Sequence, residues 1–329
     1  MRLARRFGFP PILQIEPTNM CNLRCLTCAT GSKMMKRPGV LMPFETFRSI
    51  IDQVKDYVYF LAFWSWGEPF LHKDAFRMIR YARDQGIIVH CSTNGHFFDT
   101  RERARQVIES GLDSLIVAVD GLDQQTYVKY RKGGELNRVI KSIENLVAER
   151  SSAGVKHPLI TFRFIVMKHN EQQLDQVRDF AEGLGVDVLT FRSAVVQRSE
   201  VNLEDKLAPS LVKFQQHESE GSPAGENRAK RCRFICNRPY ANLTIFSNGD
   251  VVSCENDFDS VMPLGNVSDK SLHEIISSER SRSFLEKFHR DLDQMPFCRS
   301  CEMRDMKYHT ANVDTCILNR EFYESRFKD

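Results

Sequence analysis

The stretch MCNLRCLTC, residues 20–28, comes soon after the start of the chain and contains three cysteines, Cys21, Cys25 and Cys28. Their spacing, Cys-x3-Cys-x2-Cys, allows one loop to bring three thiolates to a single point. Structural zinc sites close with four protein ligands, whereas sites that bind a further molecule keep one position open. The loop therefore predicts a thiolate metal site with one coordination position free.

Iron–sulfur clusters are held by cysteine thiolates, and a four-iron cluster offers four irons to ligate. Three cysteines would leave one of these irons for another molecule. Two alternatives stay open on the residues alone. One is a zinc ion that takes its fourth ligand from His72, His90 or His96, and the other is a set of three unrelated thiols.

The composition limits the class of protein. The chain has 329 residues, 42% apolar content and a formal net charge of +3, which suits one large core with a smaller appended unit. No clustered basic face is present, so nucleic acid is not an expected partner. The longest apolar run, Tyr57–Trp64, is much shorter than a membrane span of about 20 residues.

The N-terminus is basic but lacks the apolar region of a secretory signal, so we expect a cytoplasmic protein. The cytosol keeps thiols reduced, and the ten cysteines therefore favour metal or redox chemistry over disulfides.

Short apolar segments rich in branched residues alternate with amphipathic helical segments in the first part of the chain. The predicted strands are Ile12–Glu16, Val58–Phe63, Ile87–Ser92, Ser114–Val119, Leu159–Met167 and Val186–Phe191. The predicted helices begin after Pro43 and near Lys73–Gln85, Arg101–Ser110, Leu136–Arg150 and Glu171–Leu184. This order predicts an α/β fold, with a parallel sheet or barrel and the helices outside it.

Polar or small residues follow every predicted strand. Besides the cysteine loop, these segments are Trp66–Pro69, Ser92–Gly95, Asp120–Gly121, Lys168–Asn170 and Arg192–Ala194. Parallel α/β proteins build their sites at the carboxyl ends of the strands. We therefore expect one composite site.

The pattern changes after Val196. Residues 197–231 are polar with a Ser/Gly/Pro cluster, which predicts a linker or insertion with a short helix near Leu211. Residues 232–329 form a second unit, in which ANLTIFSNGDVVSC, residues 241–254, predicts a hairpin that turns at Asn248–Gly249. A helical stretch is expected at Leu272–Arg290. The predicted domains are thus residues 1–196 and 232–329.

Taken together, the cysteine loop after the first strand, GEP at 67–69, STNG at 92–95 and VDG at 119–121 resemble the radical S-adenosylmethionine (radical SAM) superfamily. The resemblance covers about Ile12 to Phe191. It implies a partial (β/α)6 TIM-like barrel and a 4Fe-4S cluster whose open iron binds S-adenosyl-L-methionine. It also implies reductive cleavage of that molecule to a 5′-deoxyadenosyl radical, which takes a hydrogen atom from the substrate.

The resemblance also implies roles for individual residues. Thr27 departs from the pattern, because many members carry an aromatic residue before the third cysteine. The implied cluster ligands are Cys21, Cys25 and Cys28. The residues implied to bind the amino group of the methionyl moiety are Gly67, Glu68 and Pro69, and those implied to contact the ribose or methionyl end are Ser92, Thr93 and Asn94. Asp120 is implied to face the nucleoside, and Arg131 is implied to bind the methionyl carboxylate.

A second cysteine set reads Cys236-x17-Cys254, followed after 43 residues by Cys298-x2-Cys301. This arrangement resembles the C-terminal SPASM/twitch domain found behind many radical SAM cores. It implies one auxiliary 4Fe-4S cluster with these four cysteines as ligands. A zinc site is the alternative, and Cys232 could replace or supplement Cys236.

Cys91, Cys232 and Cys316 remain. Each is either an inert thiol or, by resemblance to radical epimerases of the superfamily, a hydrogen donor to a substrate radical.

The ligand spacing is similar to that of a twitch dehydrogenase that oxidises an aminocyclitol alcohol. We therefore expect oxidation of a small hydroxylated substrate, sugar-like or cyclitol-like, with help from the auxiliary cluster and an electron donor such as flavodoxin or ferredoxin. The alternatives are a radical epimerase with a cysteine donor, a peptide-modifying maturase and a non-catalytic zinc-binding scaffold. A leader-binding domain typical of maturases does not fit before the first strand.

Overall fold

The computed structural model describes residues 8–195, 206–215, 236–299, 301 and 312–326. They contain a ten-stranded sheet in the order β10-β6-β5-β4-β3-β2-β1-β7-β8-β9. The six strands that come first along the chain are β1 (Ile12–Ile15), β2 (Phe60–Ala62), β3 (Ile88–Thr93), β4 (Ser114–Ala118), β5 (Leu159–Val166) and β6 (Val188–Ser193). Each pairs in parallel with the next along the chain. The partial (β/α)6 barrel predicted from the sequence is confirmed.

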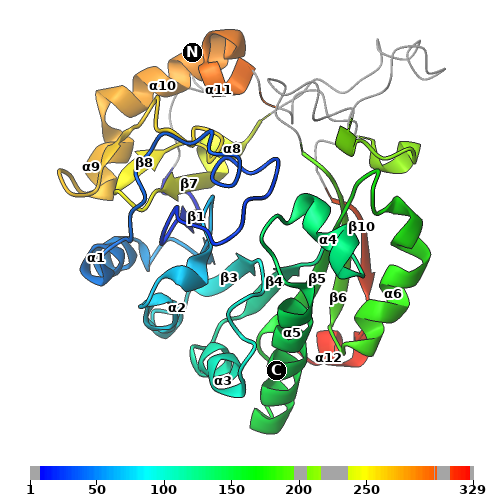
Figure 1. The fold of residues 1–329 in the computed structure, drawn as a ribbon. Coiled ribbons are helices and arrows are strands. Elements are labelled where there is room, and N and C mark those ends of the chain that lie inside the picture. The colour runs from blue at the N-terminus through cyan, green and yellow to red at the C-terminus, as the bar shows by residue number, and fades with distance from the viewer. Residues whose placement is uncertain (1–7, 196–205, 216–235, 300, 302–311, 327–329) are drawn as a thin grey trace.

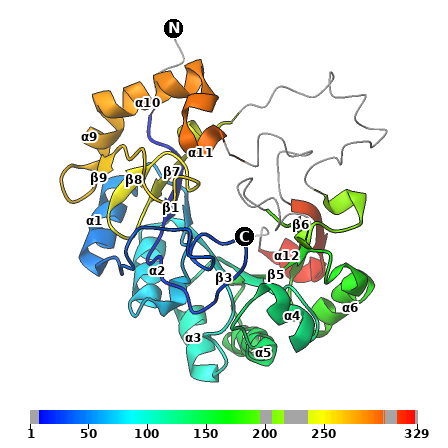
Figure 2. The ribbon, with the colours of Figure 1, turned by 45° about the horizontal axis from the view of Figure 1, so that its top comes forward.

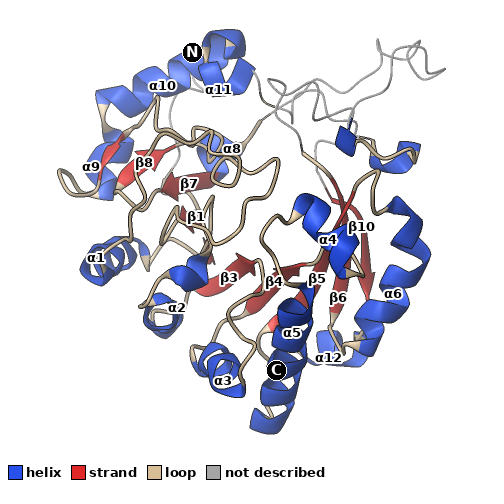
Figure 3. Ribbon diagram, viewed as in Figure 1, coloured by secondary structure: helices blue, strands red, loops and turns tan. Residues whose placement is uncertain are grey.

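Helices cover the outer side of these strands (Figures 1 and 3). They are α1 (Phe44–Val54), α2 (Ala75–Asp84), α3 (Arg101–Glu109), α4 (Gln124–Tyr130), α5 (Leu136–Ala153) and α6 (Leu174–Gly183). The short α4 was not predicted; it begins at Asp123, whose side chain accepts a hydrogen bond from the backbone N–H of Thr126 at 2.8 Å. None of the helices in the described ranges is long and apolar enough to cross a bilayer.

The two faces of the barrel sheet differ in chemistry because side chains alternate along each strand. Residues such as Val89, Val117 and Phe162 belong to one hydrophobic core with helix residues such as Ile143. We call this the outer face. The alternate positions form the inner face, which carries many polar or charged side chains. These include His90, Ser92, Thr161, Arg163, Thr190 and Arg192.

The C-terminal part extends the same sheet at both edges. Strand β7 (Asn242–Ile245) pairs in parallel with β1, and β8 (Asp250–Val252) and β9 (Gly265–Asn266) follow in antiparallel order. Strand β10 (Asn312–Ile317) pairs antiparallel with β6 at the opposite edge. The predicted hairpin is confirmed, but the sequence did not indicate that it would join β1.

The remaining helices gather at the two edges. Figures 1 and 2 show α9 (Leu272–Ser277), α10 (Glu279–Arg290) and α11 (Pro296–Arg299) near β7 and β8, and α12 (Arg320–Ser325) near β6. Helix α8 (Arg238–Ala241) leads into β7. The single helix expected at Leu272–Arg290 is two helices, because Ser278 has extended backbone and its hydroxyl accepts a hydrogen bond from the N–H of Ser281, which starts α10.

Most of the predicted linker, residues 197–231, lies outside the described residues. The part that the structure describes is helical at Lys206 and Leu207 and contains a 3-10 turn, Val212–Phe214, close to the short helix expected near Leu211.

Candidate cluster sites

The cysteine loop follows β1, and backbone hydrogen bonds fix its conformation and attach it to the segment after α4. The N–H of Arg24 donates to the carbonyl of Lys132 at 2.9 Å, and the N–H of Cys28 donates to the carbonyl of Cys25 at 3.4 Å. Gly31 is required here, because a Cβ at this position would lie 2.6 Å from the backbone nitrogen and oxygen of Cys25. The loop therefore presents its three thiols from a fixed backbone.

The three thiols have polar neighbours from different strand ends. The amide nitrogen of Asn94 lies 3.8 Å from Cys21 Sγ, Arg131 Nη1 lies 3.6 Å from Cys25 Sγ, and Cys28 Sγ lies 3.8 Å from the carbonyl oxygen of Trp66. Burial, and next the nearby Glu68 carboxylate, raise the pKa of Cys21 to about 12. Burial also raises the pKa of Cys25. Such a site disfavours free thiolates and would need a metal centre to stabilise them.

The imidazole rings of the three histidines suggested as zinc ligands make other contacts within the protein. Both ring nitrogens of His72 are hydrogen-bonded, to the carbonyl of Met42 and the N–H of Asp74. His96 accepts from the N–H of Glu135 and contacts Asn94 through its other nitrogen. His90 packs against Trp64. In the described ranges, no three His, Cys, Asp or Glu side chains are grouped to hold a single metal ion.

Gly67 and Glu68 pack directly onto the cysteine loop. A Cβ at Gly67 would lie 2.0 Å from the carbonyl oxygen of Thr18, so glycine is required there. The N–H of Glu68 donates to the carbonyl of Met20 at 2.8 Å. The segment 67–69 and the start of the cysteine loop are thus joined through their backbones.

The Glu68 carboxylate does not point to an open site. It is buried and accepts hydrogen bonds from the hydroxyl of Thr93 (2.8 Å), the N–H of Asn94 (2.8 Å) and the N–H of Phe70 (3.2 Å). Burial raises its pKa to about 7, against the opposing effect of these bonds. The geometry therefore does not favour direct binding of the amino group of the methionyl moiety by the Glu68 carboxylate. Glu68 instead connects residues 67–69 to the end of β3.

Asp120 and Arg131 form a buried ion pair next to the loop. Arg131 Nε donates to Asp120 Oδ2 at 2.5 Å, and the other carboxylate oxygen accepts from the N–H of Ile165 at 2.7 Å. Because Arg131 also reaches Cys25, the pair joins the ends of β4 and β5 to the cysteine loop. The hydroxyls of Thr27 and Tyr130 are 2.8 Å apart, so a nearby aromatic ring comes from α4 instead of position 27.

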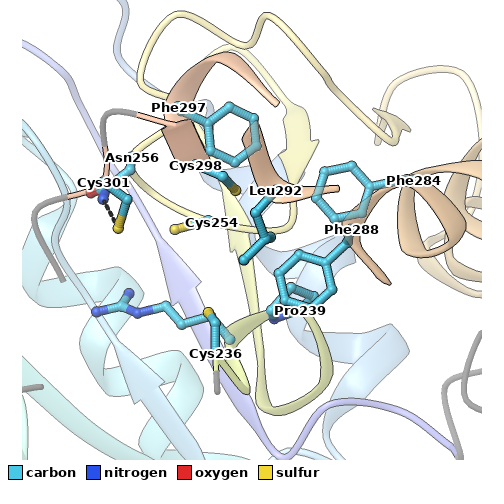
Figure 4. Close-up of a pocket in the computed structure, with 11 residues that line it drawn as sticks. Cys236, Pro239, Cys254, Asn256, Phe284, Phe288, Leu292, Phe297, Cys298 and Cys301 are labelled. Atoms are coloured by element: carbon cyan, nitrogen blue, oxygen red, sulfur yellow. Dashed lines mark hydrogen bonds between the residues drawn. The ribbon is translucent and has the colours of Figure 1, made fainter. Parts of the chain in front are cut away.

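The second cysteine set converges on one pocket. The four predicted ligands line it together with Arg238, Pro239, Asn256 and aromatic and leucine side chains of the C-terminal helices (Figure 4). The amide nitrogen of Asn256 lies 3.7 Å from Cys301 Sγ. Burial raises the pKa of Cys254, and the Arg238 guanidinium opposes this shift. An apolar pocket with four thiols and one cation suits an anionic iron–sulfur cluster. Cys232 lies outside the described residues.

Two of the candidate hydrogen donors lie away from the inner face. Cys91 is fully buried in the outer core, and its thiol donates to the carbonyl of Phe63 at 3.2 Å. Cys316 of β10 pairs with Leu189, an outer-core residue of β6, and paired residues share a face. These positions argue against hydrogen donation by Cys91 and Cys316.

The inner face contains charged side chains that the sequence did not single out. Arg163 lies in the middle of β5, and Glu255 follows Cys254. The Glu255 carboxylate accepts hydrogen bonds from Gln14 of β1 at 2.6 Å and from Arg238 at 2.8 Å. The signal for Arg163 was present, since a charged residue inside an otherwise apolar strand needs a reason.

Comparison with known families agrees with this geometry. The Radical SAM superfamily matches residues 15–181, and an iron–sulfur cluster-binding domain, SPASM, matches residues 236–302. The first match covers more than half of the chain, so this protein belongs to the radical SAM superfamily and carries a C-terminal SPASM domain. Its cofactors are accordingly S-adenosylmethionine, the 4Fe-4S cluster that binds it and an auxiliary iron–sulfur cluster.

Curated relatives have diverse names. The tungsten-containing aldehyde ferredoxin oxidoreductase cofactor-modifying protein of Pyrococcus furiosus is 25% identical over 319 residues, covering 89% of this chain and 87% of the relative. Fe-coproporphyrin III synthase of Methanosarcina barkeri is 29% identical over 173 residues, which are 52% of this chain. This chain covers only 41% of that synthase.

Two solved structures share the fold over most of the chain. BtrN in complex with AdoMet and 2-DOIA has a TM-score of 0.56 at 16% identity, covering 94% of this chain and 99% of BtrN. Streptococcus suis SuiB bound to its precursor peptide SuiA has a TM-score of 0.65 at 15% identity, covering 92% of this chain and 71% of SuiB.

Proposed function

We propose that this radical SAM enzyme oxidises a hydroxyl-bearing small molecule, sugar-like or cyclitol-like, bound against the inner face of the barrel. The observation that carries the proposal is the position of Glu255. This residue follows Cys254 of the second cysteine set, and its side chain bonds to Gln14 on the inner face of β1. A substrate on the inner face would therefore contact the surroundings of both cysteine sets.

In this proposal Cys21, Cys25 and Cys28 ligate the first cluster, and Cys236, Cys254, Cys298 and Cys301 ligate a single auxiliary cluster. When bound, the cofactors supply one electron to cleave S-adenosylmethionine, a 5′-deoxyadenosyl radical to remove a substrate hydrogen atom, and an acceptor for the second electron. The donor of the first electron would be a protein such as flavodoxin or ferredoxin.

The surrounding residues have positioning roles in this scheme. Glu68 holds residues 67–69 against Thr93 and Asn94 and so positions the backbone carbonyl of Gly67 as an acceptor for the ammonium group of S-adenosylmethionine, which has only donors. Arg131, oriented by Asp120, offers its guanidinium to the methionyl carboxylate. Ser92 is assigned to the ribose or methionyl end and Pro69 to shaping the turn.

The domain division proposed with this function is a core of residues 1–196, a linker or insertion of 197–231 and a cluster-binding unit of 232–329. The core alone would hold S-adenosylmethionine, and the second unit would complete the substrate site.

A peptide-modifying maturase is the second candidate. Two observations favour it: SuiB has the same fold and is bound to a peptide, and a relative that matches 99% of this chain at 20% identity is the PqqA peptide cyclase of Bradyrhizobium diazoefficiens. An epimerase is less well supported, because Cys91 and Cys316 lie on the outer face and only Cys232 remains as a donor.

The test is anoxic reconstitution with iron and sulfide, followed by reduction in the presence of S-adenosylmethionine. We expect a brown protein that forms 5′-deoxyadenosine, and a variant with Cys21, Cys25 and Cys28 replaced by Ala that forms none. Cys298→Ala should still form 5′-deoxyadenosine but give little product. A colourless protein containing zinc and no iron would refute the proposal.

The reaction type is then separated by substrate screening. Anoxic small-molecule and peptide fractions are tested for compounds consumed together with 5′-deoxyadenosine formation. Consumption of a hydroxylated small molecule with loss of two hydrogens supports the oxidase, consumption of a peptide supports the maturase, and solvent deuterium in an otherwise unchanged product supports the epimerase.

A further inference from the structure

We propose that the substrate carries an oxyanion, a carboxylate or a phosphate, bound by Arg163 and Arg192 on the inner face of the barrel. This inference rests on the proposed function, because it assumes that the substrate occupies the inner face. It goes further by assigning the chemical class of the group that anchors the substrate.

The two arginines come from neighbouring strands and share one face. Arg163 of β5 pairs in register with Thr190 of β6, and Ile165 of β5 pairs with Arg192. Paired residues point to the same side of a sheet, and residues two apart on a strand do so as well. The guanidinium groups therefore project from diagonal positions on the inner face, where one ligand group can contact both.

Polar atoms at this place have no hydrogen-bond partner among the residues that the structure describes. The Nε of Arg163 and the hydroxyl of Thr190 are both buried and make no hydrogen bond in the described part of the chain. The guanidinium of Arg192 likewise has no hydrogen bond or ion pair among the described residues. Buried polar groups are nearly always paired in folded proteins, so unpaired donors beside each other require an explanation. An acceptor ligand supplies it.

The acidic groups nearby are already engaged. Asp120 is paired with Arg131 at 2.5 Å, and Glu255 is paired with Arg238 at 2.8 Å. Four guanidinium groups thus share two carboxylates. Asp120 attracts Arg163, and Glu255 and Asp120 attract Arg192, but neither carboxylate forms an ion pair with these two arginines among the described residues. Burial, and then repulsion from Arg192, lower the pKa of Arg163 to about 9; burial lowers the pKa of Arg192 as well. An uncompensated charge in a half-buried place is costly unless a ligand of opposite charge balances it.

The chemistry of the guanidinium group selects the ligand. Its planar fork of donors matches the two oxygens of a carboxylate or a phosphate, and it has no acceptor for a hydrogen bond from a ligand donor. His90 of β3 also lies on the inner face, and its pKa is lowered to about 4 by burial and by the charge of Arg163. At neutral pH this imidazole adds no positive charge, so the arginines provide the attraction.

The cofactors would bring anionic groups of their own, but these have other partners. The pocket of the second cysteine set is lined by Arg238 and not by Arg163 or Arg192. The methionyl carboxylate of S-adenosylmethionine is assigned to Arg131, which contacts the cysteine loop. Competition with S-adenosylmethionine is nevertheless the decisive measurement, because its carboxylate is the nearest alternative ligand.

The experiment measures binding of sodium phosphate and of sodium malonate to the reconstituted enzyme by calorimetry, at low and constant ionic strength. We expect the wild-type enzyme to bind at least one of them, also when S-adenosylmethionine is saturating. The double variant Arg163→Gln/Arg192→Gln should bind at least about tenfold more weakly, because charge-assisted hydrogen bonds are lost. Stronger binding of phosphate identifies a phosphoryl substrate, and stronger binding of malonate identifies a carboxylate.

Two control variants keep the test decisive. Arg178→Gln removes an exposed arginine from α6 and should bind the anions as the wild type does. Arg163→Lys/Arg192→Lys keeps both charges but lacks the planar fork, so it should bind the anions more tightly than the Gln variant and more weakly than the wild type. Equal binding by the wild type and a folded Gln variant, no binding of either anion to the wild type, or displacement of the anion by S-adenosylmethionine would each overturn the inference. None of these readouts needs turnover, so they are independent of whether 5′-deoxyadenosine is formed.

Discussion

The carboxylate of Glu68 connects two segments that the family resemblance treats as separate binding motifs. It is fully enclosed and takes hydrogen bonds from a hydroxyl and two backbone N–H groups, on Thr93, Asn94 and Phe70. A residue in this position acts on the ligand through the backbone that it holds. Its substitution should therefore change cofactor binding more than cluster content.

We predict that Glu68→Gln weakens S-adenosylmethionine binding by about tenfold, because an amide N–H₂ placed against these donors leaves at least one of them unpaired. Equilibrium dialysis with the reconstituted enzyme measures the change. Iron content should stay at the wild-type value, and Glu182→Gln on exposed α6 is the matched control. Unchanged affinity in Glu68→Gln would contradict the positioning role.

His90 gives the protein a pH-dependent stability. Burial, followed by the charge of Arg163, lowers the pKa of His90 to about 4, whereas an unfolded histidine titrates near 6.5. Between these values the unfolded chain binds a proton that the folded protein does not, so the free energy of unfolding falls as the pH falls from about 6.5 towards 4.

We predict that His90→Gln reduces this loss by up to about 1.4 kcal/mol per pH unit over that window. Anoxic thermal unfolding at pH 6.5 and at pH 5 measures it, with His273→Gln on exposed α9 as the control. The same loss of stability in His90→Gln and in the wild type would show that another group is responsible.

At the scale of elements, a buried ion pair connects helix α5 with the residue that precedes strand β6. Arg150 of α5 donates to both carboxylate oxygens of Asp187, at 2.5 and 3.0 Å, and the two side chains are only 4% and 0% exposed. Asp187 also accepts from the N–H of Ile160, and its carbonyl accepts from the N–H groups of Leu318 and Asn319 after β10. One residue thus holds α5, β5 and the end of β10 together.

We predict that Asp187→Asn lowers the free energy of unfolding by about 3–5 kcal/mol, because the charge of Arg150 would stay buried without its partner. Denaturant unfolding under anoxic conditions measures the loss. Arg178→Gln breaks an exposed pair with Glu182 and should cost about 0.5 kcal/mol or less. A loss in Asp187→Asn as small as in this control would show that the pair is not stabilising.

The six barrel strands could be predicted because each is a run of branched apolar residues with a glycine or polar boundary on either side. The pairing of β7 with β1 could not, since nothing local in Asn242–Ile245 indicates which distant strand lies beside it. The grouping of Cys236, Cys254, Cys298 and Cys301 around one pocket agrees with their spacing in the sequence. Arg192 lay in a segment expected at the site, and Arg163 could have been noted as a charge within an apolar strand. The orientation of Cys91 could not be predicted, because a strand buried on both faces does not reveal which alternate residues face inwards.

At the scale of the whole molecule, the two cysteine sets come from separate segments: the first follows β1, and the second comes from segments around β7, β8 and α11. We predict that they load independently. The variant lacking Cys21, Cys25 and Cys28 and the variant Cys298→Ala should each retain about half of the wild-type iron, since each would lose one of two four-iron clusters. Iron and sulfide analysis after anoxic reconstitution measures this. Cys316→Ala should retain all of the iron, and complete loss in either ligand variant would contradict independent loading.

Both edges of the six-stranded barrel sheet are paired with strands that come late in the chain, β1 with β7 and β6 with β10. During translation the barrel strands leave the ribosome first, with rows of unpaired N–H and C=O groups on β1 and β6. These groups can pair with other nascent chains until Asn242–Ile245 and Asn312–Ile317 have been synthesised. Strands β7 and β10 therefore protect the two edges of the barrel sheet from mispairing, and the barrel is exposed to aggregation until both strands have been synthesised.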